Sequence, residues 1–339
     1  MNKIKFSDNK NFDIIPLGRA AVDLNANELY RTLEETDTFS KYVGGSPANI
    51  AIGLARLDKN VGFIGRVADD QFGNYVLQYF QNEGINISNL HLDNSGAKTG
   101  LTFTEIKSKT ESSILMYRNQ AVDLKLCTDD INEEYIKQSK ILLISGTALS
   151  KSPSREAAFL AMRYALNNNV KIIFDIDYRP YSWVNELETS IYYYQAAEMS
   201  DIIIGSRSEF NYMQRLDHTE NLSDEEVANT WLNKKSEIIV IKHGADGSTA
   251  YTKNGEHYDI KIFPVELMKS FGGGDAYASA FIYGLLENWD IIDALEFGSA
   301  SASMLVSAHS CSDAMPKVDD IRKFIREKKE KYGERIVRV

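Results

Sequence analysis

Three consecutive glycines followed directly by an acid, in the stretch KSFGGGDAYASAF at residues 269–281, are the residues best suited by type and spacing to chemistry. Glycine lets the backbone adopt positive φ and approach a ligand closely. In front of a helix, such a run directs unpaired N–H groups at one point, where the helix dipole favours negative charge. Gly272, Gly273 and Gly274 are therefore predicted to bind a phosphate group beside Asp275. A glycine-rich turn with Asp275 as an ordinary helix N-cap is the alternative.

A carboxylate beside a transferable phosphate is best used as a base for the acceptor hydroxyl. Phosphoryl transfer depends mostly on positioning and electrostatic stabilisation, so an aligned acid and an anion hole provide most of what it needs. The motif is not a Walker loop, since no GK[ST] follows it. A dinucleotide-dependent dehydrogenase is disfavoured, because no GxGxxG follows the first predicted strand.

Composition limits the class of protein. The 339 residues are 43% hydrophobic and 25% charged, as in an ordinary globular protein. The net charge of −10 argues against a nucleic-acid surface. No secretory signal and no apolar stretch long enough to span a bilayer is apparent, so we expect a cytoplasmic protein without a membrane partner. The only cysteines, Cys127 and Cys311, lack metal-ligand spacing and are expected to be reduced thiols.

Apolar strand-like runs alternate with helical patterns along most of the chain, which predicts a layered α/β fold in a single domain, residues 1–339. Several runs are nearly continuous in Ile and Val, as in strands buried on both faces of a parallel sheet. The predicted strands are Phe12–Leu17, Val61–Ile64, Ile141–Ile144, Lys171–Asp175, Asp201–Ile204, Ile238–Lys242 and Thr249–Thr252. The predicted helices include Asn49–Leu57, Gly73–Glu83, Arg155–Asn167, Asp224–Lys234 and a charged helix in the C-terminal tail.

Two segments depart from this alternation. GLTFTEIKSKTESSILMYR, at residues 100–118, has two runs of alternating polarity around a polar turn, which predicts a hairpin with one solvated face. The residues before Val43 also lack a clear helix. We predict a small accessory sheet inserted from about residues 24–43 and 99–120.

Two motifs far apart in the chain together resemble the signatures of the ribokinase-like (PfkB-type) sugar kinases. The first is GGSPANIAIGLARLDKNVGFIGRVADDQFG, which begins at Gly44, and the second is KSFGGGDAYASAF. The resemblance covers roughly residues 12–325. It implies a three-layer α/β/α core with a small β-sheet lid, and a kinase that uses ATP and Mg²⁺.

The resemblance also implies roles for individual residues. Asp275 matches the family's catalytic base, and the glycines before it match the anion hole. Asp23, interpreted as the end of the first strand, matches the acid that binds sugar hydroxyls. The residues that match the substrate loop and its amide are Gly44, Gly45 and Asn49.

A second set of residues matches the nucleotide and metal elements of the family. IKHGADGS resembles the nucleotide loop, with Gly244 and Gly247 near the phosphates and Lys242 in contact with them. The same residues also form a β-turn. Glu209, in GSRSEF, matches the acid that organises magnesium, often through water; Ser206 stands where the family usually has Asn.

The sugar is expected to be an acid. Arg118 closes the predicted hairpin and Arg179 follows a strand end, and a guanidinium can grip a carboxylate bidentately. For either arginine alone, a salt bridge is the alternative. DYRPYSW is similar to the corresponding stretch of kinases that act on 2-keto-3-deoxygluconate and on 5-dehydro-2-deoxygluconate. MKSFGGGDAYASAF and HSCSDAMP resemble the latter group, in which Lys269 replaces the usual first Asp.

The implied reaction is phosphorylation of 5-dehydro-2-deoxy-D-gluconate at its C6 hydroxyl. The alternatives are the same chemistry on 2-keto-3-deoxygluconate, fructose or ribose, and, in a different class, a catalytically silent sugar or nucleotide sensor on the same fold. The resemblance further implies a homodimer formed through the exposed face of the lid sheet.

Overall fold

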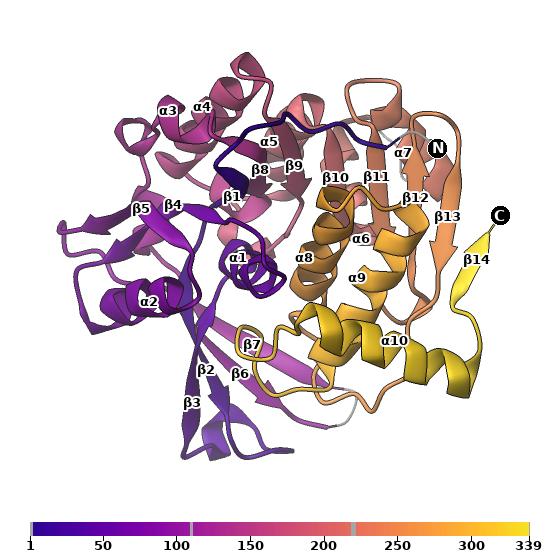
Figure 1. Ribbon diagram of the computed structural model, residues 1–339. Helices are drawn as coiled ribbons and strands as arrows, with labels where there is room; N and C mark the ends of the chain where they lie inside the picture. The colour runs from indigo at the N-terminus through magenta and orange to yellow at the C-terminus, as the bar shows by residue number, and fades with distance from the viewer. Residues whose placement is uncertain (1–2, 109–110, 218–221, 339) are drawn as a thin grey trace.

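The computed structural model describes residues 3–108, 111–217 and 222–338. Within these residues a ten-stranded sheet forms the centre of the molecule, and a separate four-stranded sheet lies at one end of it. Helices cover both faces of the large sheet (Figure 1). The predicted three-layer α/β/α core with a small second sheet is confirmed.

The large sheet has the strand order β14-β13-β12-β11-β10-β9-β8-β1-β4-β5. All pairs from β5 to β11 are parallel, and β12, β13 and β14 extend the sheet in antiparallel pairs. The bounds are β1 Phe12–Leu17, β4 Gly62–Ala68, β5 Asn86–Asp93, β8 Ser139–Ser145, β9 Lys171–Asp175, β10 Ile202–Ser206, β11 Ile238–Lys242, β12 Ser248–Thr252, β13 His257–Ile260 and β14 Ile336–Arg338.

Alternate residues of the central strands belong to two separate apolar cores. Ile14 packs with the helices of one face, whereas its neighbour Ile15 packs with those of the other, as the period of two in a strand requires. One face carries α1 Ser46–Arg56, α2 Gln71–Asn82, α8 Gly273–Leu286, α9 Ile291–Val306 and α10 Val318–Tyr332. The other carries α3 Glu133–Ile136, α4 Ser154–Asn167, α5 Glu186–Met199, α6 Arg207–Met213 and α7 Asp224–Leu232.

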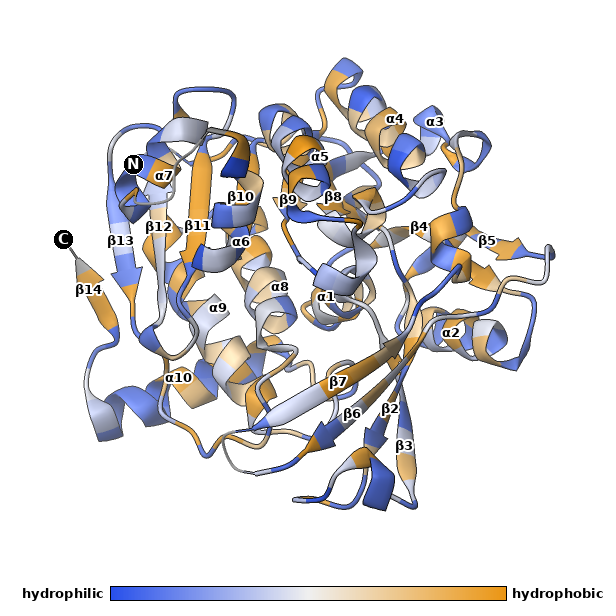
Figure 2. Ribbon diagram, turned by 180° about the vertical axis from the view of Figure 1, so that it is seen from behind, coloured by the Kyte–Doolittle hydropathy of each residue, from blue (hydrophilic) through white to orange (hydrophobic). Residues whose placement is uncertain are grey.

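Hydropathy follows this layering: β11 is strongly apolar, whereas α10 is largely hydrophilic (Figure 2). Of the helices in the described ranges, none has both the length and the apolar character needed to cross a bilayer.

The small sheet, called the lid sheet below, has the order β3-β2-β6-β7. Its strands are β2 Ala21–Ala26, β3 Phe39–Gly44, β6 Leu101–Ile106 and β7 Ser112–Tyr117. Both predicted insertions therefore contribute strands, and the hairpin is the β6–β7 pair.

The prediction that Asp23 ends the first strand is wrong. β1 ends at Leu17, and Asp23 lies inside β2, in the lid sheet. Gly18, at φ 147°, separates the two strands, so one apolar run of the sequence is divided between two sheets. The same break lets the lid begin at Ala21, earlier than predicted.

One row of side chains crosses the lid sheet on the face that carries Asp23. Asp23 pairs in register with Tyr42 and Thr102, and Thr102 pairs with Met116. Register partners point to the same side of a sheet, so these four residues share a face. The neighbouring row, which includes Phe103 and Leu115, points the other way.

Candidate active site

The glycine run forms the first turn of α8. Gly272 is the N-cap, at φ 82°, which favours glycine. A Cβ on Gly272 would lie 2.5 Å from the Cys311 sulfur, and one on Gly274 would lie 3.2 Å from Lys242 Nζ. Gly273 and Gly274 lie in the first turn of the helix, where backbone N–H groups have no hydrogen-bond acceptor within the helix. This turn, with an ammonium beside it, is suited to bind a phosphate.

Asp275 lies in the same turn and is joined to α1. Asn49 Nδ2 donates a hydrogen bond of 2.7 Å to Asp275 Oδ2. Asn49 Oδ1 is buried and has no partner among the described residues, so it is available to a substrate hydroxyl. Asn49 lies in the first turn of α1, whose N-cap is Gly45, at φ 100°. A Cβ on Gly45 would lie 2.5 Å from the Arg19 carbonyl oxygen, so the backbone passes close to Arg19 here.

The lid sheet brings Asp23 to the same place. A Cβ on Gly44 would overlap the Asp23 carboxylate, at 2.0 Å from Oδ1, so only glycine leaves room for this acid. The charge of Asp275 is one of the causes that raise the pKa of Asp23, which indicates that the two carboxyl groups lie near each other. The structure thus brings together five residues predicted from sequence: Asp23, Gly44, Gly45, Asn49 and Asp275.

Burial controls the titration of both acids. Desolvation raises the pKa of Asp23 to about 6, and Arg19 and a hydrogen bond from Thr102 oppose the rise. Desolvation also raises the pKa of Asp275, followed by the charge of Asp177, while the Asn49 hydrogen bond lowers it. A raised pKa makes Asp275 a stronger base than an exposed carboxylate.

Two further acids at the carboxyl end of β9 were missed by the sequence reasoning. Asp175 accepts a hydrogen bond of 2.9 Å from Ser46 Oγ. Burial raises the pKa of Asp175 to about 7, and the Lys242 charge opposes this. Asp177 accepts from Ser145 Oγ at 3.0 Å. The available signal was DID at the end of a buried parallel strand, where α/β proteins place ligand contacts.

Lys242 and the turn after β11 lie opposite the start of α8. The Lys242 ammonium has no hydrogen bond or ion pair to any described residue, and it approaches Gly274. Gly244 and Gly247 have φ values of 60° and 102°, and a Cβ on Gly247 would lie 2.0 Å from the Ile260 carbonyl oxygen. The turn that sequence predicts is present, and its nucleotide contact stays a prediction.

Glu209 is engaged by backbone amides. Its two carboxylate oxygens accept from Tyr178 N–H at 2.9 Å and from Ser206 N–H at 2.6 Å, and Ser206 completes a capping box at the start of α6. In residues 3–108, 111–217 and 222–338 no cluster of three or more His, Cys, Asp or Glu could by itself hold a metal. Magnesium in phosphate-transfer sites is held by one or two carboxylates, waters and the phosphates. One or two of the neighbouring acids Glu209, Asp175 and Asp177 would be enough for such a site.

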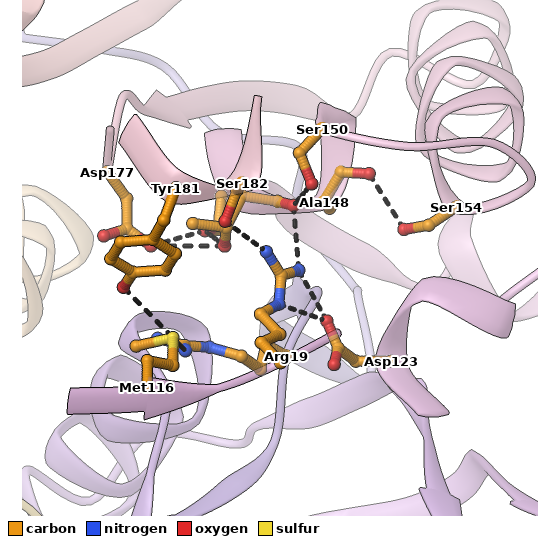
Figure 3. A network of polar contacts seen from close by, with 12 residues as sticks. Arg19, Met116, Asp123, Ala148, Ser150, Ser154, Asp177, Tyr181 and Ser182 are labelled. Carbon is orange, nitrogen blue, oxygen red and sulfur yellow. Dashed lines mark hydrogen bonds and ion pairs between the residues drawn. The ribbon is translucent and has the colours of Figure 1, made fainter. Parts of the chain in front are cut away.

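Arg118 and Arg179, the predicted carboxylate clamp, both have partners within the protein. Arg118 Nε donates to Asp123 at 3.0 Å, and its Nη atoms donate to Ser182 Oγ at 3.1 Å and to the Thr147 carbonyl at 3.0 Å; the acceptors Asp123 and Ser182 are labelled in Figure 3. Arg179 Nη2 pairs with Asp177 Oδ1 at 2.8 Å. The clamp stays a prediction, and the salt-bridge alternative is present for both arginines.

A third arginine, Arg19, was missed. It lies between β1 and β2, is 5% exposed, and donates from Nη1 to Met116 Sδ at 2.9 Å. Its Nε is buried without a partner among the described residues. Its position directly after the first strand, in LGRAAVD, was the signal that could have found it.

Lys269 is bound by the segment that packs against the glycine turn. Its side chain is 1% exposed, and its ammonium donates to the Ser310 carbonyl and, at 3.4 Å, to Cys311 Sγ. Desolvation lowers the pKa of Lys269, and Asp23 and Asp275 are among the charges that oppose this. Lys269 therefore supports the segment on which Gly272 packs, and its charge acts on the site from a distance.

The chain is similar to known carbohydrate kinases. The family model described as pfkB family carbohydrate kinase matches residues 12–318. A curated protein named 5-dehydro-2-deoxygluconokinase, from Clostridium tetani, is 61% identical over 338 residues, which cover 100% of each chain. The protein of the same name from Clostridium beijerinckii is 59% identical over 338 residues, again with 100% of each chain covered.

The fold is shared with solved structures at lower identity. A putative ribokinase II from E. coli, solved in complex with ATP and Mg²⁺, is 21% identical and superposes with a TM-score of 0.84 over 93% of this chain and 99% of that one. At this identity the likeness concerns the fold alone.

Proposed function

The chain belongs to the pfkB family of carbohydrate kinases, and we propose that it transfers the γ-phosphoryl group of ATP to the C6 hydroxyl of 5-dehydro-2-deoxy-D-gluconate. The observation that carries the proposal is the Asn49–Asp275 hydrogen bond at the glycine-rich start of α8. The substrate is supported by full-length relatives of that name at 61% and 59% identity.

Asp275 acts as the base for the C6 hydroxyl. The Asn49 bond holds its Oδ2, which leaves Oδ1 to accept the hydroxyl proton as the oxygen attacks phosphorus. Asp23, from the lid sheet, binds hydroxyls of the sugar chain, and the unpartnered Asn49 Oδ1 accepts from another. These contacts fix the acceptor in line with the transferred group, which is the main catalytic requirement of phosphoryl transfer.

The phosphate is held at the start of α8. The amides of Gly272, Gly273 and Gly274 stabilise the charge on the transferred group, and Lys242 adds a cation beside Gly274. The turn with Gly244 and Gly247 lets the backbone pass close to the ATP phosphates. Glu209, Asp175 and Asp177 are the residues that would hold Mg²⁺, which when bound neutralises phosphate charge.

The lid sheet supplies both a substrate contact and a means to exclude water, which competes as phosphoryl acceptor. Its outer face offers a dimer contact. Leu115 and Tyr117 are 47% and 61% exposed, and Tyr117 extends a row of ring contacts through Phe103 to Phe39. We include a homodimer through this face, and a cytoplasmic location, in the proposal.

The test is ADP release with Mg-ATP and four acceptors in parallel: 5-dehydro-2-deoxygluconate, 2-keto-3-deoxygluconate, fructose and ribose. We expect strong preference for the first. Preference for one of the other three would assign the same chemistry to another sugar. No turnover of any, with sugar or nucleotide binding intact, would favour the sensor.

A further inference from the structure

Three arginines lie around the part of the site formed by the lid sheet and the segment after β9, and they differ in how well the protein satisfies them. Arg118 presents its Nε/Nη2 edge to Asp123, and Arg179 is paired with Asp177. Arg19 has no ion-pair partner among the described residues. Of the three arginines, Arg19 is therefore the one best able to pair with a bound anion.

The environment of Arg19 is unusual for a buried cation. The residue is only 5% exposed, yet among the described residues the only hydrogen-bond acceptor of its guanidinium is the thioether sulfur of Met116, at 2.9 Å. Sulfur is a weak acceptor. A buried charge without a good partner is strongly destabilising, so the free protein carries a cost that a bound anion would remove.

The unpaired Nε/Nη2 edge of Arg19 has the donor arrangement that a carboxylate requires. Nε is buried without a partner, and no hydrogen bond from Nη2 to a described residue is present. The same Nε/Nη2 edge of Arg118 donates twice to one oxygen of a carboxylate, Asp123 Oδ2. Two parallel N–H donors on one edge match the two oxygens of a carboxylate.

The position of Arg19 fits one end of a sugar acid whose other end meets Asp275. Met116, its partner, shares a face of the lid sheet with Asp23. Tyr181 Oη donates to the same Met116 sulfur, at 3.0 Å, so a second donor lies beside the guanidinium (Figure 3). The charges of Arg19 and Asp275 both act on the pKa of Asp23, so Asp23 lies near each of them.

We infer that Arg19 is the residue that binds the carboxylate of the sugar acid and so sets the preference for acids over neutral sugars. This inference rests on the proposed function, whose substrate has a carboxylate at C1 and the reacting hydroxyl at C6. The chain lies across Asp23, with C6 at Asp275 and C1 at the Nε/Nη2 edge of Arg19. Tyr181 donates to the same carboxylate when it leaves Met116.

The experiment compares the acid with its neutral amide, 5-dehydro-2-deoxygluconamide, in wild type and in Arg19→Met, a change that keeps most of the side-chain volume. Wild type should favour the acid in kcat/KM. Arg19→Met should lose about 100-fold or more with the acid, as expected for two charge-assisted hydrogen bonds, and change little with the amide. Arg19→Lys should recover part of the preference.

Thermal unfolding gives a readout that does not depend on turnover. Free Arg19→Met should be at least as stable as wild type, because a buried unpaired charge is replaced by an apolar group. The sugar acid should raise the Tm of wild type and not that of Arg19→Met, whereas Mg-ATP should raise both, which verifies the fold of the variant.

Matched variants separate this inference from its rival and from the proposed function. If Arg179→Met or Arg118→Lys abolishes the preference for the acid while Arg19→Met retains it, the inference is overturned. The same holds if wild type uses acid and amide equally. If wild type phosphorylates no sugar acid, the proposed substrate fails, and the inference fails with it unless the acid still raises the Tm through Arg19.

Discussion

Asn49 Nδ2 lies 2.7 Å from Asp275 Oδ2, and this hydrogen bond joins the first turns of α1 and α8. The two residues are distant in sequence, and each carries a separate part of the acceptor site. The bond fixes the direction of the Asp275 carboxylate and lowers its pKa against the desolvation that raises it.

Removal of the base should abolish turnover without loss of binding. Asp275→Asn preserves shape and the neighbourhood of Asn49, and should reduce kcat by about 10²–10⁴-fold, the usual contribution of general base catalysis. Calorimetric titration should find sugar affinity within a few-fold of wild type. A variant that keeps full activity would contradict the assignment of Asp275.

Removal of the Asn49 hydrogen bond should move the acid limb of the pH–rate profile. The base must be deprotonated, and its pKa is raised, so kcat/KM falls with decreasing pH at a higher pH than for an exposed carboxylate. Asn49→Ala removes a contact that lowers this pKa, so the limb should shift to still higher pH. The profile of kcat/KM against pH is the measurement, and an unchanged limb would mean that the group titrating is not Asp275.

Stability should depend on pH through Asp23. Its folded-state pKa is raised from 3.8 to about 6, so folding favours the protonated carboxyl group. The resulting contribution to the free energy of unfolding is complete below about pH 4 and is lost as the pH rises through about 6. The loss is at most about 3 kcal/mol. Urea unfolding at pH 4.5 and 7.5 should show a smaller fall in the free energy of unfolding for Asp23→Asn than for wild type. Equal falls in both proteins would rule out Asp23 as the source.

The glycine N-cap of α8 should tolerate no side chain. Gly272→Ala must adopt φ 82° and place a methyl group 2.5 Å from the Cys311 sulfur. Gly255 is the matched control, since it has φ 83° with open space around it. Both changes should cost about 1 kcal/mol from backbone conformation. Only Gly272→Ala should lose more stability and raise the KM for ATP; equal effects on both would remove the steric argument.

Lys242 should act on the nucleotide and not on the sugar. Lys242→Met removes the unpaired ammonium near Gly274 and should raise the KM for ATP about 10- to 100-fold, the value of a charge-assisted hydrogen bond. The KM for the sugar should change little. Lys253→Met, at a lysine that donates to the Lys234 carbonyl on the surface, is the control and should leave both constants unchanged.

The sequence by itself determined the strands of the core and the glycine motif. β1, β9 and β11 have the predicted bounds, because strands buried on both faces require continuous Ile and Val runs. The glycine motif at 272–275 could be predicted from neighbouring residues alone, because its geometry depends on the positive φ of glycine and on the helix that follows directly. The strands β5, β13 and β14 were not predicted; they lie at the two ends of the large sheet, where burial imposes a weaker pattern.

Only the tertiary structure decided which charged side chains are free. The sequence shows Arg19, Arg118 and Arg179 as equivalent cations, but the fold pairs Arg118 with Asp123 and Arg179 with Asp177. It leaves the Nε of Arg19 buried with no partner in the part of the chain that the structure describes. It also placed Asp23 in the lid sheet. Hydrogen-bond satisfaction depends on groups from distant elements, and no local pattern carries that information.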